Sequence, residues 1–88
     1  MVKNIKDSQY KLNSLGELFS PNGKRILPKN GIVNVTKNGK NTRRTLLSLM
    51  IETFQLENDT IQIEDNGYYG LDNLISISYL KDFYLTHV

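Results

Sequence analysis

The side chains best suited to binding a polyanion lie almost entirely in the first half of this sequence. Residues 1–44 hold ten of the eleven Lys and Arg residues against two acids, which leaves a net charge of +8. Residues 45–88 hold one base, Lys81, against seven acids, which leaves −6. A protein that needed charge only for solubility would mix positive and negative residues along the chain. The separation of the charges therefore predicts a polyanionic partner for the basic half.

Many of these bases belong to a stretch with the pattern of a β-hairpin. Residues 32–37 are β-branched and alternate, Asn38-Gly39 is the preferred type I′ turn, and a return strand is expected over 41–45. A two-stranded ribbon fits the major groove of DNA, although charges on an exposed strand also simply prevent unwanted strand pairing. The candidate nucleic-acid-binding residues are Lys24, Arg25, Lys29, Lys37, Asn38, Lys40, Asn41, Arg43 and Arg44.

The acidic half has a solvated surface as its simplest interpretation. It could instead dock a basic protein, or mimic DNA phosphates toward a DNA-binding host protein. Glu64 and Asp65 supply two carboxylates of the kind that bind Mg²⁺, but the sequence supplies no further ligands and no metal site is expected. The possible partner face consists of Glu57, Asp59, Glu64 and Asp65.

The residue inventory excludes most catalytic chemistry. The sequence has no Cys, and its one His is His87, so thiolate metal sites, Ser-His-Asp triads and multi-His metal centres are not expected. There is no Gly-rich phosphate-binding loop, no secretory signal, and no apolar run near the roughly 20 residues of a membrane span. We therefore expect a cytoplasmic protein with no catalytic residues, no cofactor and no membrane association.

The expected fold class is α+β, with small antiparallel β-hairpins followed by a central helix and a degenerate ββα unit. The apolar stripe of Leu46, Leu49, Met50 and Phe54 predicts a helix over 46–56, which Thr45 can cap. We expect a single domain over 1–88, with a basic β module at 10–45 and an acidic, helix-containing module at 46–88. Other expected elements are a loose lead-in at 1–9, strands near 10–12, 17–20, 24–27 and 60–64, a helical turn near 72–74, and a last short helix capped by Ser78.

The order of several short motifs resembles one nuclease family. Residues 10–20 (YKLNSLGELFS) are similar to the Y-x-V-S-N-x-G-x-V-x-S motif that precedes the HNH, or His-Me finger, nuclease of phage and homing endonucleases. Residues 31–40 resemble the G-Y-x-x-V-x-L-x-x-N-G-K hairpin of those proteins. Residues 44–54 resemble their strand-to-helix passage, and residues 61–66 and 71–78 resemble V-N-H-x-D-G-N and R-x-E-N-L-E-W-V-T. The resemblance implies a DNA-contact module and a phage origin.

Three positions depart from the family in ways that remove its chemistry. The first catalytic-motif His of the family falls on Leu47, the general-base His on Gln62, and the Asn of the nuclease helix on Tyr69. Leu47 cannot bind a metal, and Gln62 has no group that accepts a proton from water near pH 7. The resemblance therefore implies an HNH-like scaffold that is catalytically inactive.

Three functions follow from these observations. The first is a non-enzymatic protein that binds double-stranded DNA, a phage regulatory protein acting in the host cytoplasm as a monomer or homodimer. The second is a protein-binding inhibitor or regulator of a host nucleic-acid enzyme, working through the acidic half. The third is a residual metal-dependent nuclease that uses Asp65, which the missing His residues make the weakest of the three.

Overall fold

The first 26 residues form a four-stranded antiparallel sheet. In this computed structural model, which describes residues 1–87, the strands β1 (Val2–Asn4), β2 (Lys11–Asn13), β3 (Leu18–Phe19) and β4 (Arg25–Ile26) pair in sequence order. Leu12 and Leu18 lie opposite each other in β2 and β3, and both are buried. The expected loose lead-in at 1–9 is wrong, because β1 pairs with β2 and Ile5 is buried in the core.

The predicted hairpin is confirmed as a separate two-stranded sheet. Strand β5 (Ile32–Lys37) pairs with β6 (Lys40–Thr45), and the return strand begins one residue earlier than expected. Asn38 and Gly39 have φ angles of 51° and 77°, the two positive values that a type I′ turn requires. Because Asn and Gly tolerate this conformation best, these two residues set the register of the ribbon.

Helix α1 (Leu46–Thr53) follows β6 without a loop and closes the core. The Thr45 side chain accepts a hydrogen bond from the Ser48 N–H, as predicted for the N-cap. The helix ends three residues before the expected boundary at 56, because Gln55 takes a left-handed φ of 55°. The buried core that joins the first sheet, β5 and α1 consists of Ile5, Leu12, Leu18, Val33, Val35, Leu46, Leu49 and Met50.

A second antiparallel pair follows α1. Strand β7 (Thr60–Gln62) is two residues shorter than expected and pairs with β8 (Leu74–Ser76), after a single 3₁₀ turn (Leu71–Asn73) close to the one predicted. The segment between the two strands docks on the first sheet through Tyr69. Gly16 permits this close approach, since a Cβ at Gly16 would lie 2.4 Å from the Tyr69 carbonyl carbon.

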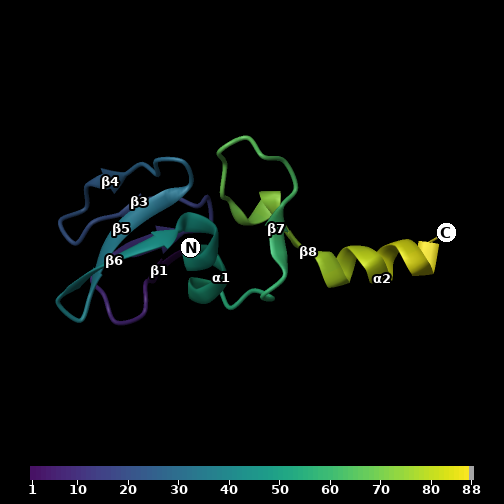
Figure 1. Ribbon diagram of the computed structural model, residues 1–88, viewed down its shortest axis with the longest axis horizontal. Helices are drawn as coiled ribbons and strands as arrows, with labels where there is room; N and C mark the ends of the chain where they lie inside the picture. Colours follow the sequence, from purple (N-terminus) through teal and green to yellow (C-terminus); the bar gives the residue numbers. More distant parts are fainter. Residues whose placement is uncertain (88) are drawn as a thin grey trace.

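The last element, α2 (Ile77–His87), runs away from the rest of the molecule, and the long axis measures 49 Å against 23 Å for the other two (Figure 1). Ser76, rather than the predicted Ser78, precedes the helix and accepts the Tyr79 N–H. Asp59 adds a second cap, because its carboxylate accepts the N–H and hydroxyl of Ser78 and the hydroxyl of Ser76. Hydrogen bonds from Ser78 and then Ser76 hold the pKa of Asp59 below its usual value.

The structure confirms the expected α+β class, with antiparallel hairpins, a central helix and a C-terminal helix. Within residues 1–87, neither helix has the length and apolar character needed to cross a membrane.

Candidate nucleic-acid interface

Alternation along the β5–β6 hairpin sorts its side chains onto two faces. Val33 and Val35 of β5 are buried against the core, so the residues between and beside them point the other way. The cross-strand partners continue this division, since Asn34 lies opposite Arg43 and Thr36 lies opposite Asn41. We call the exposed surface of Asn34, Thr36, Asn41 and Arg43 the outer face.

The outer face presents four polar side chains that the fold itself does not use. Among residues 1–87, none of these four side chains makes a hydrogen bond or an ion pair with another residue. Arg and Asn side chains are the ones that make bidentate contacts with guanine and adenine edges in the major groove. The sequence analysis included Asn41 and Arg43 but missed Asn34 and Thr36, which the two-residue period of the strand would have identified.

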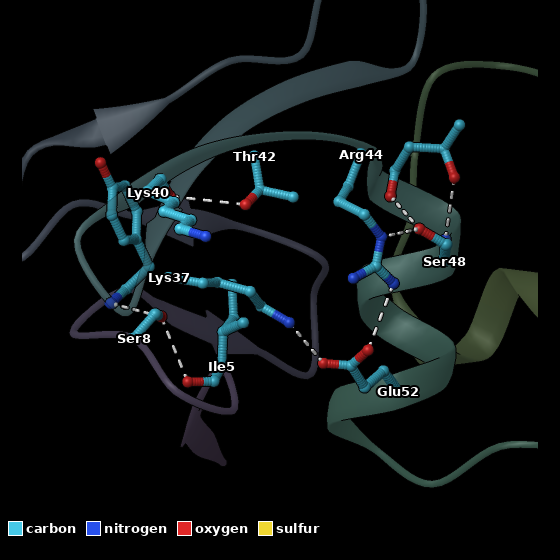
Figure 2. A network of polar contacts seen from close by, with 10 residues as sticks. Ile5, Ser8, Lys37, Lys40, Thr42, Arg44, Ser48 and Glu52 are labelled. Carbon is cyan, nitrogen blue, oxygen red and sulfur yellow. Dashed lines mark hydrogen bonds and ion pairs between the residues drawn. The ribbon is translucent and has the colours of Figure 1, made fainter.

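On the opposite face of the hairpin, the side chains of two residues predicted to bind DNA contact α1 instead. Lys37 Nζ lies 2.8 Å from Glu52 Oε1, and Arg44 Nη2 lies 3.3 Å from Glu52 Oε2 (Figure 2). The Arg44 Nε also donates to the Ser48 hydroxyl at 3.2 Å. Two of the predicted nucleic-acid-binding residues therefore hold the hairpin against α1, and we call Lys37, Arg44 and Glu52 the clamp.

We expect the clamp to make stability depend on acid pH. The hydrogen bond from Lys37, with the charges of Lys37 and Arg44, lowers the pKa of Glu52 from its ordinary value of 4.5. The clamp contribution is therefore complete above pH 4.5 and is lost as the pH falls through the lowered folded-state pKa. Because the clamp is partly exposed, its full contribution should be about 1 kcal/mol or less.

Urea unfolding at a series of acidic pH values will measure this contribution. A Glu52→Gln variant should lack that part of the pH dependence. A variant curve that runs parallel to the wild-type curve through this range would contradict the assignment.

The other predicted bases divide into paired and unpaired groups. Arg25 forms an ion pair with Glu17 at 2.8 Å, so it too is engaged within the fold. Lys24, Lys29 and Lys40 are exposed and form no ion pair within residues 1–87. The predicted residue Asn38 lies at the hairpin tip, where its backbone N–H donates to the Asp7 carbonyl oxygen.

Three turns meet at the end of the molecule opposite α2 (Figure 1). The loop between β1 and β2, the turn between β3 and β4, and the hairpin tip line one open groove of about 680 Å³, with Lys6, Pro21 and Asn38 among its residues. Lys24 belongs to the turn between β3 and β4, Lys6 belongs to the loop between β1 and β2, and Lys40 directly follows the hairpin turn as the first residue of β6. This end, which we call the basic end, adds Lys6 to the bases that the sequence analysis selected.

The four acids of the predicted partner face do not form one surface. Glu57 precedes β7 and lines a groove with the start of α2, while Glu64 and Asp65 follow β7 at its other end. Asp59 is half-buried and serves as a cap for α2. Within residues 1–87, no three His, Cys, Asp or Glu side chains are grouped closely enough to hold a metal ion.

Leu47, Gln62 and Tyr69, the three positions at which the sequence differs from the motifs that it resembles, contribute to the fold. Leu47 is half-buried on α1, and Tyr69 packs against the core. The Gln62 amide donates to the Tyr68 carbonyl oxygen at 3.1 Å and so supports the segment between β7 and β8. No protein-family model matches this sequence, and no curated protein or solved structure is significantly similar to it.

Proposed function

We propose that this chain is a non-enzymatic protein that binds double-stranded DNA through the β5–β6 hairpin. The observation that carries the proposal is the outer face, where Asn34, Thr36, Asn41 and Arg43 are exposed together and left unused by the fold. The core and the clamp hold the ribbon from behind, so it would enter a groove with little loss of conformational freedom. We extend the proposal to an inactive HNH-like scaffold of a phage regulatory protein, as the sequence motifs suggest.

The proposed contacts fall into two classes. Arg43 and Asn41 on the outer face would reach base edges in the major groove, with Asn34 and Thr36 beside them. The unpaired lysines Lys24, Lys29 and Lys40, with Lys6 at the basic end, would contact phosphates and fix the position of the ribbon. Of the acids in the second half, Glu52 is neutralised by Lys37 and Arg44, and the others follow α1 in the chain, where β7, β8 and α2 lie on the far side of α1 from the hairpin tip (Figure 1).

Fluorescence anisotropy with a labelled duplex at several salt concentrations tests this function. The four lysines proposed to contact phosphates should make log K fall with log[salt] at a slope of about −4. Binding should be strongest at the lowest salt concentration, about 50 mM. Absence of binding to any duplex at that concentration would refute the proposal. A slope near zero with measurable binding would exclude phosphate contacts by the lysines.

Inhibition of a host nucleic-acid enzyme through the acidic half is the competing proposal. The four acids are dispersed along β7. Inhibition therefore has less support than DNA binding, which the outer face supports. Capture of one stoichiometric host protein from nuclease-treated lysate, with loss of capture in a Glu64→Lys, Asp65→Lys variant, would favour inhibition over DNA binding.

A further inference from the structure

The open groove at the basic end is lined by polar side chains that the fold does not use. Among residues 1–87, no other residue hydrogen-bonds to the lining side chains of Asn4, Gln9, Tyr10, Thr36 and Asn38. These side chains supply three amides and two hydroxyl groups, each of which can both donate and accept hydrogen bonds. The groove volume of about 680 Å³ lies within the range of roughly 300–1,000 Å³ that is usual for small-ligand sites.

Two rings give the groove part of its apolar surface. Tyr10 is half-buried and packs against the core, whereas Pro21 is exposed in the turn between β3 and β4. Both residues line the groove, together with the buried Ile5. A flat base can stack on an aromatic ring in such a site, while amides bond to the edges of the base.

The walls of the groove are joined to one another within the fold. At the hairpin tip, the backbone N–H of Asn38 donates to the Asp7 carbonyl oxygen at 3.0 Å. Beside this contact, Ser8 forms an antiparallel β-bridge with Lys37. The loop between β1 and β2 is therefore held against the hairpin, so a ligand would enter a preformed site with little loss of conformational freedom.

The charges of the lining residues argue against a phosphate as the occupant. The lining includes one base, Lys6, and one acid, Asp7, so it carries no net charge. The other lysines of the basic end, Lys24 and Lys40, are not among the lining residues. Phosphates would therefore lie on the lysines around the groove, and a neutral group that donates and accepts hydrogen bonds would lie within it.

We propose that this groove binds an unpaired base of the DNA that lies on the outer face, so that the protein prefers DNA with an unpaired nucleotide. The inference rests on the proposed function. Thr36 connects the two surfaces, because it belongs to the outer face and also lines the groove. A nucleotide that leaves the duplex beside the outer face thus reaches the groove directly.

Fluorescence anisotropy with four labelled duplexes of one sequence tests this preference. One duplex is fully paired, one has a single bulged nucleotide, one has the same bulge without its base, and one has a single unpaired nucleotide at its end. The bulged duplex should bind at least about fivefold more tightly than the paired and abasic duplexes, because a base stacks on Tyr10. Equally tight binding of the overhanging duplex would support the site and extend it to bases at duplex ends.

Tyr10→Leu removes the aromatic ring and keeps an apolar side chain against the core. It should abolish the preference for the bulge and leave the affinity for paired duplex unchanged. Tyr79→Leu is the matched control, since Tyr79 is 62% exposed on α2 and lies outside this groove. Gln9→Ala alters an exposed residue and should reduce the preference about two- to tenfold, the effect of one lost hydrogen bond.

Far-UV circular dichroism will show whether each variant keeps its fold, and Gln9→Ala carries the test if Tyr10→Leu does not. Equal affinity for the bulged and abasic duplexes would overturn the inference and leave DNA binding by the hairpin in place. So would a preference for the bulge that Gln9→Ala and a folded Tyr10→Leu both retain. Absence of binding to every duplex would refute the proposed function together with this inference.

Discussion

Replacing Arg43 with Gln will weaken duplex binding about tenfold to a hundredfold, the range expected for losing an arginine that reaches a base edge. Arg43 lies on the outer face, opposite Asn34, and makes no ion pair within residues 1–87. Its loss should therefore leave the free energy of unfolding within about 0.5 kcal/mol of the wild-type value. The measurement is anisotropy on a duplex first selected for tight binding from a random pool.

Arg44 provides the matched control, because it has the same chemistry one position later and faces the other way. Arg44→Gln removes the contacts with Glu52 and Ser48, so it should lower stability by about 1 kcal/mol and change DNA affinity little. The two neighbouring arginines thus separate a binding defect from a folding defect. If both variants lost affinity to the same extent, the assignment of the outer face as the DNA-contacting surface would be wrong.

Replacing Asn73 with Ala will destabilise the fold by about 2–4 kcal/mol, the cost of removing three side-chain hydrogen bonds to backbone groups of Glu64 and Tyr68. Asn73 is 7% exposed and ties together the segment between β7 and β8. Its Nδ2 donates to the carbonyl oxygens of Glu64 and Tyr68, each at 2.9 Å, and its Oδ1 accepts the Glu64 N–H at 3.0 Å. If the amide is removed, the Tyr68 carbonyl oxygen keeps the hydrogen bond from Gln62, but the two backbone groups of Glu64 lose the partner that Asn73 supplies.

Urea unfolding of Asn73→Ala beside Asn41→Ala will test this role. Both changes remove one amide, but Asn41 is exposed on the outer face and should cost less than about 0.5 kcal/mol. Asn73→Asp gives a sharper comparison at constant size, because a carboxylate cannot donate to the two carbonyl oxygens and should repel them. Near-equal stability of Asn73→Ala and Asn41→Ala would show that water replaces the lost hydrogen bonds.

Local sequence patterns predicted the structure accurately where they agreed with tertiary packing. The β5–β6 hairpin was predicted closely because alternation and the Asn38-Gly39 turn specify both strands and register within a few residues. The same alternation would have divided the candidate bases into inward and outward sets. Counting charges along the sequence grouped Arg43 with Arg44, whereas the strand places them on opposite faces.

Contacts between distant parts of the chain were not predictable from local patterns. Ile5 lies in a polar stretch that showed no strand period, and β1 forms because β2 supplies its partner. Ser76 and Asp59 together cap α2, whereas the local sequence predicted Ser78 as the cap. The ion pair between Lys37 and Glu52 likewise depends on how β5 packs against α1, 15 residues later in the chain.

The double cap at the start of α2 has a consequence for how this helix arises. A helix of 11 residues is too short to be stable alone in water, because nucleation of its first turn is costly. Asp59 presents two carboxylate oxygens to Ser76 and Ser78 once β7 has paired with β8. The paired strands then serve as a preformed template for the first turn, so a peptide of residues 77–88 alone should be a random coil.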